Sequence, residues 1–195
     1  MDNLKNKNSK CYKEIIKNNL VEKFKNYTEN FKTIKERVNK NIEKTISKIS
    51  DLKRNKIIIL SGYPGSGKST VTSMLKDIGY QVLSLDDNIK SYKELSEIAK
   101  DKVEKKNVEH LVLDGTFLRQ KDLNEFDWVK EKKNYDLLFI YMNISIYYAY
   151  YNNINRCLDR RSKRKLVPFK VYENMEKNKD ILLPDKGVYV INYDV

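Results

Sequence analysis

The chain has 195 residues, including 39 Lys or Arg and 27 Asp or Glu, and its formal net charge is +12. This length fits one domain, or one domain with an appendage. No apolar run approaches the ~18 residues that a membrane-spanning helix needs, which excludes a membrane-embedded protein. The two cysteines, Cys11 and Cys157, show no metal-ligand spacing. Such cysteine use is typical of a reducing compartment, so we expect a cytoplasmic protein with no membrane partner.

Positive charge is concentrated at the start of the chain. Residues 1–55 hold 15 Lys or Arg and 7 Asp or Glu, a net charge of +8, whereas residues 56–195 hold 24 and 20, a net charge of +4. A basic appendage suggests a polyanionic partner, most simply a nucleic acid. The alternative is that the charge serves solubility alone, and composition does not decide between the two.

The same 55 residues contain no Gly and no Pro, and their apolar residues recur at spacings of three and four. This spacing predicts a long amphipathic helix or a helical hairpin. We expect its apolar stripe to pack on the core of the chain or on a second copy, so self-association through this helix is one expectation. The basic face could instead guide a nucleic-acid strand. We therefore divide the chain into a basic helical segment, 1–55, and a main domain, 56–195.

The main domain opens on a β-branched run, 56–60, followed by the motif G-x-x-x-x-G-K-[ST] and a helical pattern that Gly79 closes. Glycines let consecutive backbone N–H groups turn into one concavity, which binds phosphate together with the N-terminus of the next helix. The lysine reaches the outer phosphates of a nucleotide, and the serine hydroxyl ligates Mg²⁺. The predicted nucleotide-binding residues are Gly62, Pro64, Gly65, Ser66, Gly67, Lys68, Ser69 and Thr70.

Five predicted strands alternate with helical patterns after residue 55. The strands cover 56–60, 81–85, 110–114, 135–142 and 187–192, and the later helices cover 91–106, 121–133, 145–159 and 168–178. Right-handed crossovers between such strands build a parallel sheet with helices on both faces. We predict an α/β, P-loop NTPase-type three-layer fold with a five-stranded parallel sheet, preceded by an α-helical N-terminal segment.

Acidic residues follow two of these strands. Asp86 and Asp87 come directly after the second strand, and Asp114 ends the third. Ligands bind at the carboxyl ends of strands in parallel sheets. Asp86 there could accept a proton from an attacking hydroxyl, with Asp87 in reserve, or cap the following helix. Asp114 could orient Mg²⁺ or bond the backbone of the phosphate loop, and both alternatives stay open.

Three further polar features lie near the predicted strands or between the predicted helices. His110, the only histidine, begins the third strand at the end opposite the ligand rim and is interpreted as a bystander. Arg119 could reach a substrate phosphate or pair with an acid on the next helix. A basic cluster, Arg156–Lys165, lies between two helical patterns and suggests a lid whose arginines stabilise charge on the transferred group. A solvated charge run is its alternative.

The main domain resembles the P-loop kinase family that includes bacteriophage polynucleotide 5′-hydroxyl kinase. The resemblance covers about residues 56–178. It rests on the loop Gly62–Thr70, the pair Asp86-Asp87, the run Leu113-Asp114-Gly115-Thr116, and Arg160-Arg161-Ser162-Lys163-Arg164 followed by Val167-Pro168. The family has a basic residue three positions after its first acid; here that position is Ile89, and Lys90 follows.

The resemblance implies an ATP-dependent kinase that uses Mg²⁺ and acts on the 5′-hydroxyl end of a nucleic acid. It implies Lys68 and Ser69 on the phosphates and Mg²⁺, Asp86 as the base and Arg164 as the lid arginine on the donor phosphates, so that Lys68, Asp86 and Arg164 are the expected catalytic residues. From the positions of the residues we also expect Asp114 at the metal and Arg160 at the nucleotide. The expected acceptor contacts are Asp87, Lys90, Arg119 and Arg161. Alternative functions are a small-molecule or modified-base kinase of the same fold, and a nucleotide-dependent switch or interaction module.

Overall fold

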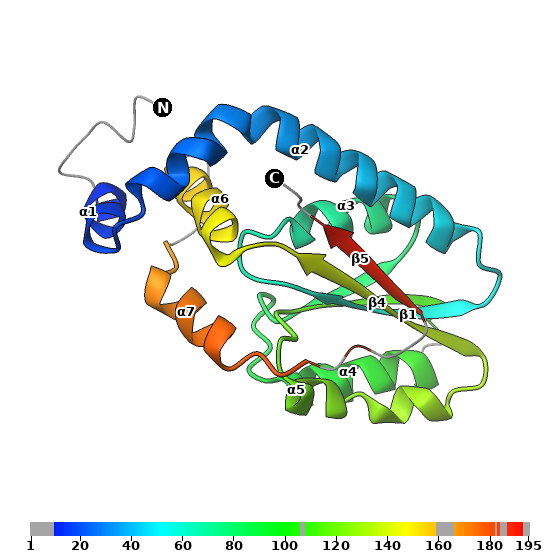
Figure 1. Ribbon diagram of the computed structural model, residues 1–195. Coiled ribbons are helices and arrows are strands. Elements are labelled where there is room, and N and C mark those ends of the chain that lie inside the picture. The colour runs from blue at the N-terminus through cyan, green and yellow to red at the C-terminus, as the bar shows by residue number, and fades with distance from the viewer. Residues whose placement is uncertain (1–9, 106–107, 159–165, 182, 184–186, 193–195) are drawn as a thin grey trace.

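The structure is a computed structural model that describes residues 10–105, 108–158, 166–181, 183 and 187–192. Within these ranges, no helix combines the length and the hydropathy that crossing a bilayer requires. Most of the described chain forms one sheet with helices packed on both of its faces (Figure 1).

The sheet has five parallel strands in the order β2-β3-β1-β4-β5, and its strands β1, β4 and β5 are labelled in Figure 1. The predicted α/β fold with a five-stranded parallel sheet is therefore confirmed. β1 lies at the centre, and in the register of the sheet Leu60 and Ser84 both lie opposite Asp114. The carboxyl ends of three strands therefore meet at one edge. The strands are β1 (Asn55–Ser61), β2 (Gln81–Ser84), β3 (His110–Asp114), β4 (Tyr135–Asn143) and β5 (Val188–Asn192).

Alternating side chains of the central strand build two separate hydrophobic layers. Ile58 and Leu60 point into the layer beneath α2, α3, α6 and α7, whereas Ile57 and Ile59 point into the layer beneath α4, α5 and η2. This period of two is the geometry of an extended strand that is buried on both faces. The helices are α1 (Lys10–Lys17), α2 (Val21–Ser50), α3 (Lys68–Asp77), α4 (Tyr92–Lys105), α5 (Gln120–Asn124), α6 (Ile146–Leu158) and α7 (Phe169–Lys177), with the 3₁₀ helix η2 (Asp127–Glu131).

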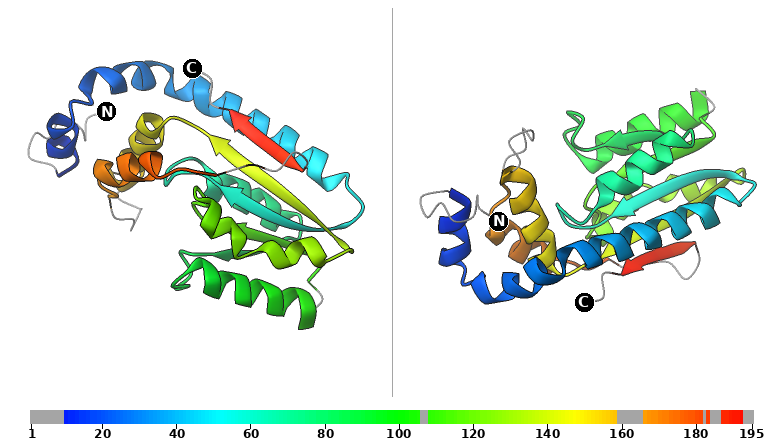
Figure 2. Two further views of the ribbon diagram at one scale, coloured as in Figure 1. Left: turned by 60° about the horizontal axis from the view of Figure 1, so that its bottom comes forward. Right: turned by 90° about the horizontal axis from the view of Figure 1, so that it is seen from above.

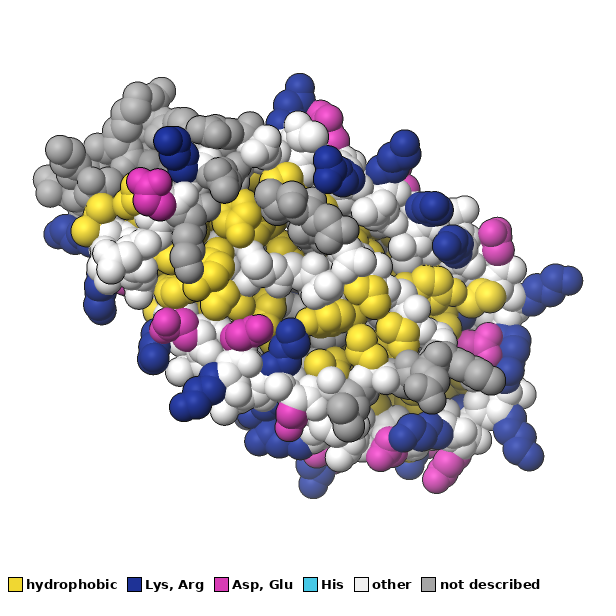
Figure 3. Space-filling view, in the orientation of Figure 1, with side chains coloured by type: hydrophobic (Ala, Val, Ile, Leu, Met, Phe, Trp, Pro, Cys, Tyr) yellow, Lys and Arg dark blue, Asp and Glu magenta, His cyan; other side chains and the backbone are white. Residues whose placement is uncertain are grey.

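Helix α2 runs for 30 residues across one face of the sheet, while α4 and α5 cover the other face (Figure 2). It contacts β5, α6 and α3. The predicted packing of its apolar stripe on the core is confirmed: the buried members are Leu20, Phe24, Ile34, Val38, Ile42, Ile46 and Ile49. Exposed lysines and arginines occupy its outer side, and Figure 3 shows a row of them along this edge of the molecule. Self-association through this helix stays a prediction.

One predicted helix is wrong in detail. The pattern at 121–133 predicts a continuous helix, but the structure has the short α5 and then η2. The indole of Trp128 donates to the hydroxyl of Ser96, which itself donates to the carbonyl of Glu125. Phe126 and Val129 are both buried on the side of α4. Because the Glu125 carbonyl accepts from Ser96 of α4, it does not continue the hydrogen-bond pattern of one long helix. Tertiary contacts therefore override the helical pattern of the sequence at 121–133.

Candidate active site

The phosphate loop connects β1 to α3 and requires glycine at two positions. Gly65 and Gly67 have φ angles of +80° and +96°, and Gly67 is the N-cap of α3. L-residues with a side chain rarely adopt this left-handed region. The loop thereby brings its backbone and the positively polarised N-terminus of α3 to one concavity, which favours an anion.

Lys68 folds back over this loop. Its ammonium donates to the carbonyl oxygens of Gly62 at 2.8 Å and Tyr63 at 3.0 Å. The loop carbonyls hold the cation at the mouth of the concavity, where phosphate oxygens would be its partners. Gly62 also needs to be small, because a Cβ there would lie 2.7 Å from Oγ of Ser66 and 2.8 Å from Cβ of Met142.

Side chains of α6 and α7 fasten the loop from one side. The amide of Asn152 donates to the carbonyl of Gly65 at 3.1 Å, and the hydroxyl of Tyr172 donates to the carbonyl of Pro64 at 3.0 Å. The hydroxyl of Tyr63 donates to the carboxylate of Glu176. Burial raises the pKa of Tyr172, which keeps its hydroxyl protonated as a donor.

The segment after β3 fastens the loop from the other side. The carbonyl of Thr116 accepts hydrogen bonds from the backbone N–H of Gly62 and from the hydroxyl of Ser61, each at 3.0 Å. Ser61 also donates to the carbonyl of Phe117 at 2.9 Å. Tyr92 of α4 shares a 2.7 Å hydrogen bond with the Thr116 hydroxyl. The end of β3, including Asp114, is therefore held at a set position relative to the phosphate loop.

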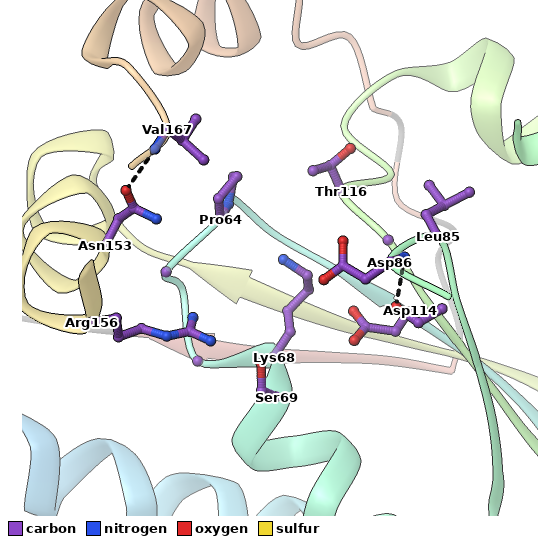
Figure 4. Close-up of a pocket in the computed structure, with 14 residues that line it drawn as sticks. Pro64, Lys68, Ser69, Leu85, Asp86, Asp114, Thr116, Asn153, Arg156 and Val167 are labelled. Carbon is purple, nitrogen blue, oxygen red and sulfur yellow. Dashed lines mark hydrogen bonds between the residues drawn. The ribbon is translucent and has the colours of Figure 1, made fainter. Parts of the chain in front are cut away.

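These elements enclose a cleft of about 580 Å³, which we call the phosphate cleft. The carboxylates of Asp86 and Asp114 lie on its β2–β3 side, Arg156 enters from α6 on the opposite side, and the side chain of Lys68 lies between them (Figure 4). The sequence-predicted residues that the structure brings together here are Pro64, Gly65, Gly67, Lys68, Ser69, Asp86 and Asp114.

A second hollow of about 570 Å³, the basic groove, shares Leu85 with the phosphate cleft and continues it towards α4 and α5. Its charged lining residues are Lys90, Lys93, Arg119, Lys121, Asp122 and Glu125. Two predicted acceptor residues, Lys90 and Arg119, are thus together. The guanidinium of Arg119 donates to both carboxylate oxygens of Asp122, at 2.9 and 3.0 Å. Of the two predicted roles of Arg119, the pairing with an acid on the next helix is therefore present in the structure. This pair raises the pKa of Arg119.

Other predicted residues lie outside these two hollows or outside the described chain. Asp87 is exposed on the turn after β2, with its backbone N–H bonded to the carbonyl of Ser84. Thr70 is exposed in the first turn of α3, and Ser66 is buried in the loop. Arg160, Arg161 and Arg164 fall in 159–165, which lies outside the described residues, so their roles stay predictions.

The oxygen ligands that line the phosphate cleft fit a magnesium ion that also binds the phosphates of a nucleotide. Among the described residues, no group of three or more His, Cys, Asp or Glu side chains could form an all-protein metal site. Mg²⁺ instead commonly uses one or two carboxylates, water and substrate phosphates. The hydroxyl of Ser69 and the carboxylate of Asp114 line the same cleft and supply this chemistry.

His110 is placed as expected for a bystander. It begins β3, at the end opposite the phosphate cleft, and its ring stacks on Tyr80 with centroids 4.8 Å apart. Burial, and secondarily the charge of Lys56, lower its pKa below 6.5. The imidazole is therefore a neutral packing group at neutral pH.

Sequence reasoning did not select several residues that line the phosphate cleft. Arg156 belongs to the predicted basic cluster and Thr116 to the run 113–116 that carries the family resemblance, but neither was assigned a role in the site. Asn153 carried no sequence signal. Asn153 is buried in α6, and its carbonyl oxygen accepts the backbone N–H of Val167 at 3.1 Å. Only the folded chain shows that this bond positions the start of α7 beside the cleft.

Comparison of the sequence with protein-family models and with curated proteins gave no match. Solved structures with similar folds include a fungal RNA kinase, with a TM-score of 0.51, 13% identity and coverage of 72% of this chain and 75% of that chain. A gluconokinase from Sinorhizobium meliloti 1021 has a TM-score of 0.50 and 13% identity, over 71% of this chain and 83% of that one. A sugar kinase from Janibacter sp. HTCC2649 has a TM-score of 0.50 and 12% identity, over 72% and 86%.

The chain therefore has the fold of P-loop kinases. At these identities the similarity concerns the fold. The names of the matched proteins state an RNA acceptor in one case and sugar-type acceptors in the others, so the fold alone does not select the substrate.

Proposed function

We propose that this protein is an ATP-dependent kinase that transfers the γ-phosphoryl group to a hydroxyl of a nucleic acid, most simply its 5′-hydroxyl end. One observation carries the proposal: the phosphate loop, Lys68 and two carboxylates line a single cleft, and that cleft continues into a basic groove. A kinase needs donor and acceptor sites that meet at the transferred group, and these two hollows supply them.

The donor phosphates would bind to the backbone N–H groups of the loop and the N-terminus of α3. Lys68 would exchange its two loop carbonyls for phosphate oxygens, which aligns the phosphates and balances their charge. Ser69 and Asp114 would hold Mg²⁺, which would neutralise negative charge on the donor phosphates when it is bound. The lid arginines Arg160 and Arg164 are proposed to contact the same phosphates.

Asp86 is the proposed general base. Its carboxylate lies in the phosphate cleft at the turn after β2, where it faces the Lys68 side of the loop (Figure 4). As the acceptor oxygen forms its bond to the γ-phosphorus, the bond from that phosphorus to the β–γ bridging oxygen breaks. The hydroxyl proton passes to the Asp86 carboxylate, and ADP leaves with the bridging electron pair.

The acceptor would occupy the basic groove. Lysines and an arginine outnumber acids among its described lining residues by four to two, which suits the phosphates that follow a 5′ end. Asp122 holds Arg119 in a fixed orientation while the Arg119 side chain remains 43% exposed. Lys90 and Arg119, together with Asp87 and Arg161, are the proposed acceptor contacts.

The test is phosphoryl transfer from γ-labelled ATP with Mg²⁺ to a panel of acceptors. The panel contains single-stranded DNA and RNA with a 5′-hydroxyl, the same oligonucleotides with a 5′-phosphate as matched controls, nucleosides and sugars. We expect label on the 5′-hydroxyl oligonucleotides and none on the blocked controls. Asp86→Asn should lower kcat by ~10²–10⁴-fold. Asp87→Asn, on the same turn, should act mainly on the KM of the acceptor.

Each contrary result has a defined meaning. Label on nucleosides or sugars but not on oligonucleotides would establish a small-molecule kinase instead. ATP binding without transfer to any acceptor would leave a nucleotide-dependent switch. If Asp87→Asn abolishes turnover and Asp86→Asn does not, the base has been assigned one residue too early.

A further inference from the structure

A third hollow of about 640 Å³ borders the phosphate loop on the side of the long N-terminal helix; we call it the α2 groove. Its walls come from α2, the first turns of α3, and α6. Gly65, Gly67, Ser69 and Arg156 line both the α2 groove and the phosphate cleft. A ligand seated on the loop can therefore extend into either hollow.

The positions of the reacting groups decide which part of a nucleotide would lie in the α2 groove. Asp86 and Asp114 line the phosphate cleft, so the terminal phosphate belongs on that side of the loop. Thr70 and Ser73 follow the loop on α3 and line the α2 groove. A triphosphate that runs from the acidic side over the α3 N-terminus emerges beside them. The nucleoside, at the other end of the phosphate chain, would then enter the α2 groove.

The lining chemistry suits a nucleoside attached to phosphates. The rings of Phe31 and Tyr148 provide apolar surface, with centroids 6.2 Å apart. Asn39 and Asn155 offer amide groups that both donate and accept, as the edge of a nucleobase requires. Lys35 and Arg156 add positive charge, and no acidic side chain is among the described residues of the lining. Its volume is within the range of known small-molecule sites.

The α2 wall is held rigidly enough to recognise a ligand. Val38 and Ile42 are 4% and 1% exposed and anchor the helix in the core beside the groove. Phe31 packs edge-on against Tyr151 of α6, with centroids 5.6 Å apart. Lys35 and Asn39 are four residues apart on this anchored helix and therefore project from the same face. Their positions do not depend on a loop.

We propose that the α2 groove is the site of the donor nucleoside, and that Asn39 of the N-terminal helix is a specificity-determining contact to its base. The inference rests on the proposed function, because it assumes a nucleoside triphosphate on the phosphate loop. It gives the N-terminal segment a direct part in donor binding. The segment is then one wall of the site, in addition to a packing element of the core.

The test measures the binding of ADP and of tripolyphosphate by calorimetry. Tripolyphosphate occupies the loop but lacks a nucleoside, so it reports on the phosphate site and on correct folding. Asn39→Leu keeps a similar side-chain volume but cannot hydrogen-bond. It should raise the Kd of ADP about five- to tenfold and leave that of tripolyphosphate unchanged. Asn41→Leu makes the same change two residues away, on a side chain outside the lining, and should change neither.

Other results overturn the inference. If Asn39→Leu binds ADP like the wild type, the base lies elsewhere; if it instead weakens a single-stranded oligonucleotide, the groove belongs to the acceptor. Lys68→Ala separates this failure from failure of the proposed function. Loss of both ligands in Lys68→Ala, with both retained in Asn39→Leu, would refute the nucleoside site alone. A wild-type protein that binds neither ligand would refute both proposals.

Discussion

Gly65 offers a quantitative test of how closely the phosphate loop is packed against α6. An added Cβ at this position would lie 2.2 Å from the backbone carbonyl oxygen of Ala149 and 3.2 Å from the backbone nitrogen of Asn153. Backbone atoms inside a helix cannot rotate away as a side chain can. The Gly65→Ala substitution must therefore displace either the loop or α6, and the φ angle of +80° adds strain of its own.

The strain of the positive φ angle and the overpacking against α6 can be measured separately, because the chain provides a matched control. Gly79 ends α3 with a φ angle of +95°, but a Cβ there would meet no atom within 4 Å. Gly79→Ala should therefore cost only the left-handed conformation, about 1–2 kcal/mol of unfolding free energy. Gly65→Ala should cost this amount and a further ~1–3 kcal/mol for overpacking. The predicted difference between the two variants is thus about 1–3 kcal/mol.

Urea unfolding followed by circular dichroism measures both variants against the wild type. We expect a lower midpoint for Gly65→Ala than for Gly79→Ala, with similar m-values. Because α6 also bears Asn152, which bonds the Gly65 carbonyl, displacement should weaken tripolyphosphate binding in Gly65→Ala alone. Equal midpoints together with unchanged binding would show that the loop does not approach α6 as closely as the structure indicates.

Two further predictions concern stability. The side chain of Ile42 is 1% exposed between α2 and the core, so Ile42→Ala should lower the unfolding free energy by ~2–5 kcal/mol. Ile16 is 47% exposed, so Ile16→Ala should change the unfolding free energy by less than about 0.5 kcal/mol. Similar losses for the two variants in urea titrations would contradict the packing of α2. Burial, and then Lys56, lower the pKa of His110 below 6.5, so the folded state binds fewer protons than the unfolded state. Stability should fall as pH drops from 6.5 to the folded-state pKa and then level off. His110→Gln should remove this slope, and an unchanged slope would assign it to other groups.

Local sequence patterns were sufficient to predict the phosphate loop, the five strands and two carboxylates of the candidate site. The phosphate loop is contiguous, and its spacing reflects the backbone turns that phosphate binding requires, so it needs no tertiary information. The five strands were also predictable, because buried parallel strands appear as short β-branched runs bounded by helical patterns. Asp86 and Asp114 could be proposed for the site because Asp86 follows one such strand and Asp114 ends another, and parallel strands present their carboxyl ends at one edge.

The tertiary structure decided which side chains actually share a cavity. The sequence allowed Arg119 either to reach a substrate phosphate or to pair with an acid on the next helix. The folded chain shows that it pairs with Asp122. The break between α5 and η2 arises from contacts of Trp128 and Glu125 with Ser96, about thirty residues earlier in the chain. The apolar stripe of α2 predicted that the helix would be buried against some surface, but its spacing does not name that surface. The packing of α2 on β5, α6 and α3 depends on contacts between residues far apart in the sequence. These contacts bring Lys35 and Asn39 beside the phosphate loop.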